Sequence, residues 1–456
     1  MSQGHVLAPA ISSEFAGAGL GDERLSKRLC VLADQLAVAP GASFPKALDD
    51  AELEAAYRFF GNGGVTPDAI LAPHVRQTVR RATGLPRIVV VHDTTAFEFG
   101  GQTKRRGLGH LIRPAAQGFF GHFSLALSAD GDRVPLGLLA LETVFRLKKR
   151  IGHKNWSPDR SLGESARWVR GIEVAEEALG GQVQAIHVAD REGDQFSLLQ
   201  ALSDASRPFV IRSFQDRRLV EGDEVRLRTA ARAAKVTFRR EVPLSPRPKL
   251  FGPKGERHPA RRFRIARLSF AATTVELKRS SLSLNVIHVF ECKPPPGQPA
   301  VEWFLLTNLP IDNDEKIGFA VDCYRTRWAI EEYFKALKTG CQFEKRQLES
   351  AHSLLNALAI LAPVAWRLLL LRHLARAPKP GPASNALTTK QLQVLRAVAK
   401  KPLPPKLNAR DAMLAVAKLG GHLKNNGDPG WLVLGRGMHD LLLLELGWRA
   451  REEAEK

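Results

Sequence analysis

Two unbroken apolar runs constrain the fold of this chain more than any other feature of its sequence. Arg87–His92 is rich in β-branched residues and ends at Asp93, and Val183–Ala189 ends at Asp190. Continuous apolar runs of this length are typical of strands that are buried on both faces of a sheet. The sequence therefore predicts a covered sheet with an aspartate at the end of each of two buried strands.

The segments between these strands complete a mixed α/β sheet. Phe119–Ser128 and Val134–Thr143 are joined by a turn with an Asp-Gly pair, which predicts a hairpin. A helix over about Gly163–Leu179 then leads to the second buried strand. In sheets of this kind ligands bind beyond the carboxyl ends of the strands, where both aspartates are expected to lie.

Helices are predicted before this sheet, in an N-terminal domain of residues 1–70. Amphipathic patterns indicate helices from Gly21 to Leu36 and from Asp49 to Phe60, and Thr66–Thr83 is a further helical segment. Arg28 lies on a basic face of the first helix. A DNA-binding head and a plain helical subdomain fit this pattern equally well, since no specific helix-turn-helix motif is present.

Residues 206–310 have a different pattern, in which short β-rich runs alternate with Pro and Gly turns. Ser206–Arg279 contains 20 Lys and Arg against 7 Asp and Glu, a net charge of +13. Uncompensated charge of one sign is unfavourable unless a partner screens it. An antiparallel β insertion that contacts nucleic acid is therefore favoured over a merely soluble basic insertion.

The chain becomes helical again towards its C-terminus. Ser350–Arg376 predicts apolar helices, and its core, Leu354–Leu371, is interrupted by Asn356, Pro363 and Arg367, which favours a buried helix pair over a membrane span. Residues 377–456 begin with a Pro-rich linker and predict further helices that end in an apolar run at Leu441–Leu444. Such a run is exposed unless a partner covers it.

The composition excludes several classes of protein. The 456 residues carry a formal charge of +20, from 67 Lys and Arg against 47 acids, which indicates a polyanionic partner, with nucleic acid the first candidate and an anionic membrane the second. The 4 cysteines form no CxxC pair, so a disulfide framework and structural zinc are not expected. The N-terminal residues lack the pattern of a secretory signal, which is consistent with a cytoplasmic protein.

The segment Tyr324–Lys338, YRTRWAIEEYFKALK, is predicted to be one helix with a polar stripe. A rotation of 100° per residue places Tyr324, Arg327, Glu331, Lys335 and Lys338 on one side. A carboxylate surrounded by cations and a phenol suits a site that binds both a phosphate group and a metal ion. The alternative is an ordinary solvated helix face, because the charged residues are also spaced as common i,i+4 ion pairs.

Asp93, Asp190 and Glu331 together form a predicted set of carboxylates. Carboxylates suit Mg²⁺ or Mn²⁺, and two such ions about 4 Å apart can promote an in-line displacement at phosphorus. Taken singly, an aspartate at a strand end is more often a turn-former or cap. The order of the three acids, with a basic insertion between the second and the third, favours phosphoryl transfer.

Short motifs along the chain resemble the DDE bacterial insertion-sequence transposases with the Y-R-E-K motif, in the branch that moves the composite kanamycin-resistance transposon. The motifs are HDTT at residues 92–95, ADRE at 189–192 and Y-x-x-R-x-x-x-E-x-x-x-x-x-x-K at 324–338. GDERLSKRL, EAAYRFF, GESARW, EWFLLTN and AKLGGH extend the resemblance from the N-terminal head to the tail. The segment Gln102–Arg113 departs from the family pattern.

The resemblance implies an RNase H-like, retroviral-integrase-like catalytic domain over residues 71–376, interrupted by the β insertion at about 206–310. It also implies an N-terminal DNA-binding domain and a helical dimerisation domain over residues 377–456. Asp93, Asp190 and Glu331 would then bind two Mg²⁺ ions, with Mn²⁺ as a substitute, as the catalytic triad. The residues implied to contact DNA are Tyr324, Arg327, Lys338, Trp303 and Arg212, and the basic residues Lys335 and Arg28 are added from the sequence pattern. Trp303 would stack on a flipped base, or alternatively serve as a core residue of its strand.

The expected function is that of a cut-and-paste DNA transposase. The resemblance implies strand nicking, hairpin formation and opening, and strand transfer, within a homodimeric synaptic complex on double-stranded DNA and without a membrane partner. The competing hypothesis is a catalytically decayed or domesticated repressor that binds the same DNA ends. A stand-alone nuclease would cut DNA but never join it.

Overall fold

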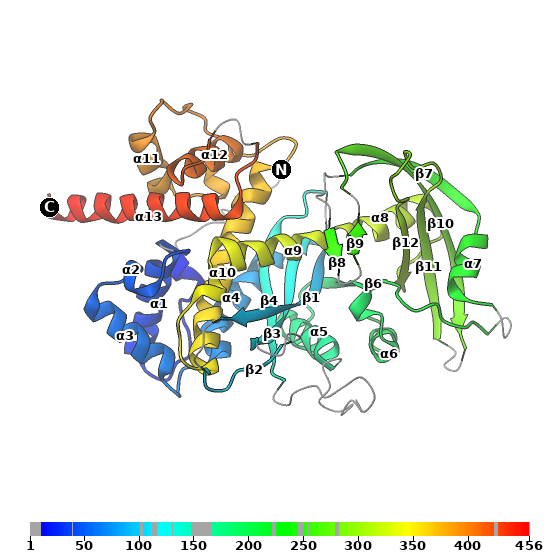
Figure 1. Ribbon diagram of the computed structural model, residues 1–456, viewed down its shortest axis with the longest axis horizontal. Helices are drawn as coiled ribbons and strands as arrows, with labels where there is room; N and C mark the ends of the chain where they lie inside the picture. The colour runs from blue at the N-terminus through cyan, green and yellow to red at the C-terminus, as the bar shows by residue number, and fades with distance from the viewer. Residues whose placement is uncertain are drawn as a thin grey trace. The chain divides into compact units, whose positions relative to one another are not determined.

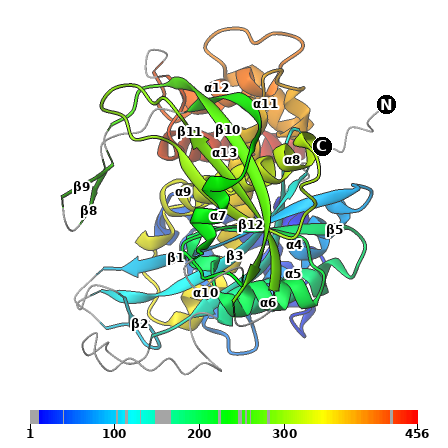
Figure 2. The same ribbon diagram turned by 90° about the vertical axis from the view of Figure 1, so that its right-hand side faces the viewer.

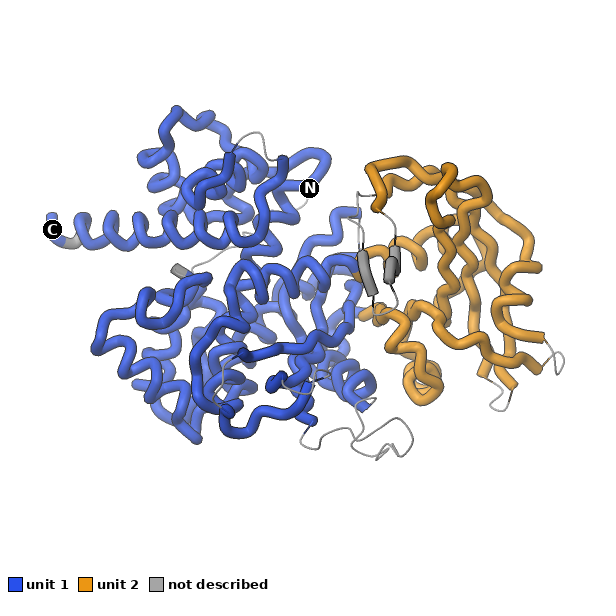
Figure 3. The backbone as a smooth tube through the Cα atoms, in the orientation of Figure 1, with its two compact units in different colours: residues 1–184, 328–456 blue, residues 185–327 orange. Residues whose placement is uncertain are grey.

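The computed structural model describes residues 11–38, 40–100, 104–111, 116–129, 131–146, 166–220, 225–244, 250–252, 255–258, 260–278, 282–423 and 427–455. The chain divides into two compact units (Figure 3). Unit 1 consists of residues 1–184 and 328–456, and unit 2 consists of residues 185–327. Unit 2 is therefore an insertion in the sequence of unit 1.

Unit 1 combines an antiparallel sheet with most of the helices (Figure 1). Its first part contains η1 (Ile11–Glu14), α1 (Glu23–Val38), α2 (Phe44–Ala47), α3 (Asp50–Gly61), α4 (Pro67–Ala82), β1 (Arg87–Phe99), β2 (Gly109–His110), β3 (Gln117–Ser128), β4 (Pro135–Val144) and α5 (Ala166–Leu179). Its second part contains α9 (Trp328–Lys335), the π-helical turn η3 (Ala336–Gly340), η4 (Phe343–Lys345), α10 (Ala351–Ala375), η5 (Ala383–Asn385), α11 (Thr389–Val398), α12 (Ala409–Leu419) and α13 (Trp431–Ala454).

The helices of the N-terminal part begin where their capping residues predict. The side chain of Asp49 accepts a hydrogen bond from the backbone of Glu52, whose side chain accepts one from Asp49 in return, so α3 starts with a capping box. Thr66 caps α4, and Pro67 occupies the first turn. These two starts, and α1 itself, confirm the helices predicted from the sequence.

The sheet of unit 1 is built around β3, which pairs antiparallel with β1 and with β4. The hairpin of β3 and β4 confirms the prediction from the Asp-Gly turn, although Asp130 lies outside the described residues. β1 is longer than predicted, because it continues to Phe99. Asp93 therefore lies in the middle of a 13-residue strand, and its predicted place at a strand end is wrong. Beyond Asp93, Phe97 and Phe99 are buried, and this apolar alternation keeps the segment in the sheet.

α10 is the central helix of unit 1. It is one helix of 25 residues, so the predicted helix pair is wrong. Pro363 lies inside it, and Trp366 donates a hydrogen bond from Nε1 to the carbonyl of Pro135 at 3.0 Å. By length and composition α10 could cross a membrane, but 89% of its apolar window is buried inside the structure, as in a core helix of a globular protein.

The C-terminal helix α13 contacts its neighbours at glycines. A Cβ atom at Gly435 would lie 2.7 Å from the carbonyl oxygen of Gly340, and a Cβ atom at Gly437 would lie 1.9 Å from the carbonyl oxygen of Val416. The backbones of η3 and α12 therefore approach α13 so closely that only glycine fits at these positions. Figure 1 shows α13 running alongside α12.

Unit 2 contains a mixed sheet with a few helices (Figure 2). Its elements are β5 (Gln184–Ala189), η2 (Arg191–Gly193), α6 (Phe196–Asp204), β6 (Phe209–Arg212), α7 (Leu227–Ala233), β7 (Val236–Leu244), β8 (Leu250–Gly252), β9 (Gly255–His258), β10 (Arg264–Leu277), β11 (Leu282–Glu291), β12 (Glu302–Thr307) and α8 (Asp314–Arg325). β5 and β6 are parallel, and the order β6-β12-β11-β10-β7 continues antiparallel.

Each face of the antiparallel part of unit 2 packs against one helix. On one face the rings of Phe238 and Phe270 stack at 4.4 Å, and Phe238 lies opposite Gly318 of α8. On the other face Phe304 stacks on His288 at 4.5 Å, and Arg232 of α7 lies over Phe304 at 5.4 Å. The fold is mixed α/β, as predicted.

Candidate functional site

The predicted site residues are divided between the two units. Unit 1 contains Asp93, Glu331, Lys335, Lys338 and Arg28, and unit 2 contains Asp190, Arg212, Trp303, Tyr324 and Arg327. Within unit 1, Arg28 lies on α1, and the other predicted residues lie on β1, α9 and η3.

The segment Tyr324–Lys338 is not one helix. α8 ends at Arg325, α9 begins at Trp328, and the chain passes into the π-helical turn η3 after Lys335. At the break, the hydroxyl of Thr326 donates to the carbonyl of Cys323 at 2.5 Å. The polar stripe predicted from a single helical rotation is therefore wrong, and Tyr324 belongs to a different helix from Glu331.

In unit 1, α9 lies on the sheet face that carries Asp93. Asp93 pairs with Phe123 of β3, and residues directly opposite each other in an antiparallel pair project on the same face. The ring of Phe123 contacts the rings of Tyr333 and Phe334, each at 5.5 Å. Glu331 precedes Phe334 by three residues on α9, a spacing that places the two side chains on the same side of the helix. The packing of α9 thus places the helix that carries Glu331 over the sheet face of Asp93.

The two lysines that follow Glu331 have different surroundings. Lys338 donates from Nζ to the carbonyl oxygen of Ala96 in β1 and lies 3.4 Å from a carboxylate oxygen of Glu344. Lys335 is exposed and pairs with Glu332 at 2.7 Å, instead of with Glu331 as an i,i+4 pair. Lys338 is therefore held against the strand of Asp93, whereas Lys335 points to the surface.

Sequence reasoning missed a polar network next to Asp93. The backbone N–H of Thr94 donates to Oδ1 of Asp93 at 2.7 Å, and Oγ1 of Thr94 accepts a hydrogen bond from Nε of Arg167 at 2.9 Å. The same hydroxyl lies 2.9 Å from Nδ1 of the buried His122. Burial, with Arg167 and Arg170 nearby, lowers the pKa of His122 to about 3, so its ring is neutral near pH 7. The HDTT motif indicated Thr94, but nothing in the sequence indicated its partners.

In unit 2, Asp190 follows β5 directly, as predicted. Its side chain accepts a hydrogen bond from the backbone N–H of Glu192 at 2.8 Å and caps the short turn η2. Arg191, Arg212 and Tyr324 lie within electrostatic reach of Asp190 or of one another. Burial and the neighbouring Arg212 lower the pKa of Arg191. The ADRE motif contains Arg191, but the sequence did not indicate that it lies near Arg212 and Tyr324.

Tyr324 is buried in this group, with 5% of its surface exposed. Burial raises the pKa of its phenol, while Arg212 and Arg327 act in the opposite direction, and Arg212 is also its hydrogen-bond partner. The ring of Trp303 meets Tyr324 edge to face at 5.7 Å. Arg212, Trp303, Tyr324 and Arg327 are therefore brought together with Asp190 in one unit.

The carboxylates have the right chemistry for a divalent metal ion. Asp93 and Glu331 supply hard oxygen ligands on one sheet face of unit 1, and Asp190 supplies another in unit 2. Across the described residues, no three His, Cys, Asp or Glu side chains gather as a metal-binding group. The residue types therefore fit Mg²⁺ in kind.

Much of the basic charge of unit 2 is paired internally. Arg217 lies 2.5 Å from the buried Asp194, Arg240 pairs with Asp322 at 2.7 Å and Arg264 pairs with Glu291 at 2.5 Å. Exposed cations remain on β7 and β10, at Arg239 and Arg267. Residues 221–224, 245–249, 253–254, 259 and 279 of the basic insertion lie outside the described residues. Part of the net charge predicted to contact DNA therefore stabilises the unit itself.

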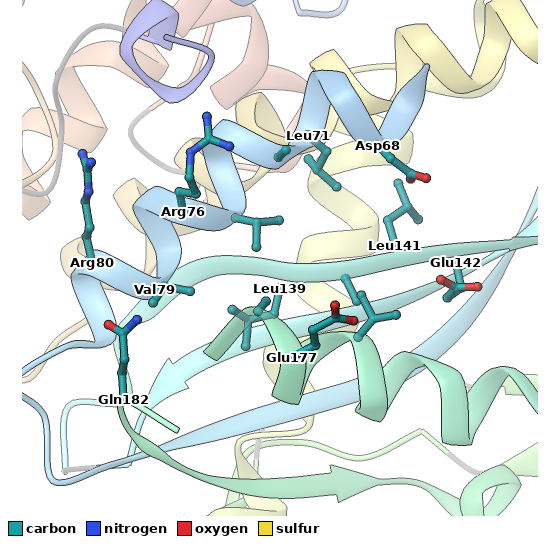
Figure 4. A pocket seen from close by; sticks show the side chains of 15 residues that line it. Asp68, Leu71, Arg76, Val79, Arg80, Leu139, Leu141, Glu142, Glu177 and Gln182 are labelled. Carbon is teal, nitrogen blue, oxygen red and sulfur yellow. The ribbon is translucent and has the colours of Figure 1, made fainter. Parts of the chain in front are cut away.

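Two of the cavities formed by described residues lie in unit 1, and none of the predicted site residues lines either of them. The larger, about 690 Å³, lies between α4, β4 and α5 and has an apolar floor (Figure 4). Arg76 and Arg80 project on one side, and Glu142 and Glu177 on the other. The smaller, about 440 Å³, is lined by polar and basic residues that include Lys46, Lys345 and Arg436.

Comparison with known proteins finds a family match in the N-terminal part. Residues 8–65 match the transposase DNA-binding family, and this range contains η1, α1, α2, α3 and the exposed Arg28. Among solved structures, the chain is similar to the piggyBac transposase in a cryo-EM structure of its synaptic complex with hairpin DNA, with a TM-score of 0.41 and 11% identity. The similarity covers 99% of this chain and 80% of that chain. The family match supports DNA as a partner of the N-terminal part.

Proposed function

We propose that this protein is a DNA transposase that excises and inserts a mobile element by metal-dependent phosphoryl transfer. The observation that carries the proposal is the match of residues 8–65 to the transposase DNA-binding family. A transposase needs a DNA-binding part and a set of acids that can hold metal ions. Residues 8–65 support the first, and Asp93, Asp190 and Glu331 are the proposed acids. The core is proposed to be RNase H-like, supported by the antiparallel β1, β3 and β4 followed by α5 and β5.

Asp93, Asp190 and Glu331 are the proposed metal ligands. Bound Mg²⁺ ions, two per site, would activate the attacking oxygen and stabilise the leaving oxygen of an in-line displacement, and Mn²⁺ would substitute. The hydrogen bond from the backbone N–H of Thr94 orients the carboxylate of Asp93. The packing of α9 against Phe123 holds the helix that carries Glu331 on the sheet. These two interactions would preorganise the acids for metal binding.

The cations and aromatic residues are the proposed DNA contacts. Arg212, Arg327 and Lys338 would bind phosphates near the cut end, with the phenol of Tyr324 beside them. Trp303 would stack on a base extruded during hairpin formation. Lys335 and Arg28 are exposed and would bind further phosphates. The active assembly is proposed to be a homodimer that pairs two transposon ends in the cytoplasm.

The experiment that tests the proposal uses the DNA that flanks the gene. Terminal inverted repeats found there would supply the end sequence, and the purified protein would be incubated with it in Mg²⁺ or Mn²⁺. Nicks at the element boundary, followed by hairpins and joined products, are the expected result. Binding without any nick would indicate a decayed or domesticated repressor instead, and cutting without joining would indicate a stand-alone nuclease.

A further inference from the structure

The smaller cavity of unit 1 gathers positive charge from three distant segments of the chain. Its lining includes Lys46 of α2, Lys345 and Arg346 at η4, and Arg436 and His439 on α13. Ser43 and Gln342 add polar side chains, and Gly41, Ala42 and Gly435 complete the lining. No carboxylate is among these lining residues.

The exposed cations of this cavity have no counter-charge within the described part of the chain. Lys46, Lys345 and Arg436 are exposed, and no described acid forms an ion pair with any of them. This differs from the inserted unit, where Arg217, Arg240 and Arg264 are paired with acids. Like charges that converge without compensation repel each other unless an anion neutralises them.

Arg346 forms the rigid wall of the cavity. Only 2% of it is exposed, and its guanidinium donates to the carbonyls of Pro40, Ala42 and Cys341 and lies over the ring of Phe44 at 4.9 Å. Its Nε is buried and has no hydrogen-bond partner among the described residues. Burial lowers the pKa of Arg346 to about 10, which still leaves it charged near neutral pH.

We propose that this cavity binds a phosphate group. Convergent Lys and Arg side chains with polar donors match a tetrahedral oxyanion, and a volume of about 440 Å³ leaves room for the sugar on either side of a phosphodiester. The phosphate can come from the DNA backbone or from free phosphate, and the two sources are separable by experiment. The DNA source rests on the proposed function, whereas binding of free phosphate does not.

The test compares the wild-type protein with the double variant Lys345→Gln/Arg436→Gln. Arg346 is left intact, so that the hydrogen bonds of its guanidinium to Pro40, Ala42 and Cys341 are retained, and Lys46 is also left unchanged. The matched control is Lys401→Gln/Lys406→Gln, which removes the same charge from exposed positions of unit 1 outside the cavity. Thermal melts without ligand check that all three proteins are folded.

In the first arm, fluorescence anisotropy measures the binding of a labelled 30-base-pair duplex over a series of NaCl concentrations. We expect the affinity of the cavity variant to fall about tenfold, and the slope of log K against log salt to become shallower by about 0.9 for each phosphate that the variant no longer neutralises. The control should retain the wild-type slope. A wild-type protein that does not bind DNA at all would contradict the proposed function and leave the second arm to decide on the cavity.

In the second arm, the melting temperature is measured with inorganic phosphate against NaCl of equal ionic strength. A saturable rise in the wild type and the control, absent from the cavity variant, would identify free phosphate as the ligand. A change in the duplex arm alone would identify the DNA backbone. If the cavity variant matches the control in both arms, the cavity does not bind phosphate.

Discussion

The acids of unit 1 and the acid of unit 2 are held in different ways. Asp93 and Glu331 lie on elements that pack through aromatic rings, with Phe123 against Tyr333 and Phe334. Asp190 instead caps a short turn and lies among arginines and a buried tyrosine. Packing fixes position, whereas a cationic surrounding attracts an anion. The packing around Asp93 and Glu331 therefore suits their proposed role as oriented metal ligands, and the cations around Asp190 suit the proposed contact with phosphate.

Removing any one of the acids should give the largest effect. We expect Asp93→Asn, Asp190→Asn and Glu331→Gln each to reduce strand cleavage by about 10³-fold or more, to background, because each removes an electrostatic group on which the transition state depends. DNA binding should change little, since affinity comes mostly from cations elsewhere. Cleavage and binding assays on the same duplex measure both. The exposed Glu173→Gln on α5 is the control, and a substantially active Glu331→Gln protein would refute the triad.

The dependence of DNA binding on salt should next separate the exposed cations of unit 2 from its paired cations. Binding of duplex DNA should weaken by roughly 10³-fold between 50 and 200 mM salt if about six phosphates are neutralised. Arg239→Gln/Arg267→Gln, on the exposed strands of unit 2, should reduce the steepness, because these cations are exposed. Arg264→Gln should act mainly on stability, because Arg264 pairs with Glu291. A binding constant independent of salt would show that the basic charge serves another purpose.

Buried charge should matter far more for stability in unit 1 than exposed charge does in unit 2. Glu14 is 1% exposed and contacts His74 at 2.6 Å and Arg81 at 2.7 Å. We expect Glu14→Gln to destabilise unit 1 by about 3–5 kcal/mol, because the charge of Arg81 is left without its partner. Glu302→Gln in unit 2, which breaks the exposed pair with Arg232, should cost about 1 kcal/mol or less. Thermal melts of both variants measure the difference, and equal losses of stability would contradict it.

The same carboxylate predicts a pH dependence. Burial alone would raise the pKa of Glu14, but the hydrogen bond and charge of His74 and then of Arg81 outweigh burial and lower it from 4.5 to about 2. A carboxyl whose pKa is lower in the folded state stabilises the fold above its unfolded pKa, and this stability is lost as the pH falls from about 4.5 towards 2. The full loss is about 3 kcal/mol. The melting temperature of Glu14→Gln should vary less over this range than that of the wild type.

The smallest effect should come from Trp303. Stacking on an extruded base stabilises it by about 1–3 kcal/mol, so Trp303→Ala should slow hairpin formation by about 5–150-fold while leaving the first nick nearly unchanged. Nicked DNA should accumulate in a time course. Trp303→Phe, which retains a ring against Tyr324, should restore part of the rate. Equal slowing of every step, together with a lower melting temperature, would assign Trp303 to the core of unit 2.

Local patterns predicted most elements of this molecule but not how the chain changes direction between them. The caps of α3 and α4 and the β3–β4 hairpin could be predicted because their signals lie within a few residues. The break at Thr326 could not, because the helical periodicity continues through it. The π-helical turn that follows ends at Gly340, whose carbonyl lies against Gly435 of α13, far away in the sequence. A one-dimensional pattern does not contain such an interaction.

The candidate site shows the same limit. Asp93, Asp190 and Glu331 could be selected by residue type and order. The sequence nevertheless places Asp93 at the end of its strand, because the first polar residue after an apolar run is the usual sign of a boundary. The contacts of Thr94 with Arg167 and of Tyr324 with Arg191 join residues that are far apart in the sequence. They are found only when the fold is known.

The insertion of unit 2 into unit 1 has a consequence for the order in which a ribosome makes the protein. Domains fold largely as units while the chain emerges, starting from the N-terminus. Unit 2 is complete once residue 327 has been synthesised, but unit 1 must wait for residues 328–456. A nascent or prematurely terminated chain can therefore hold Asp93 and Asp190 without the helix that carries Glu331. The proposed metal site of Asp93, Asp190 and Glu331 can therefore be complete only once translation of the chain is complete.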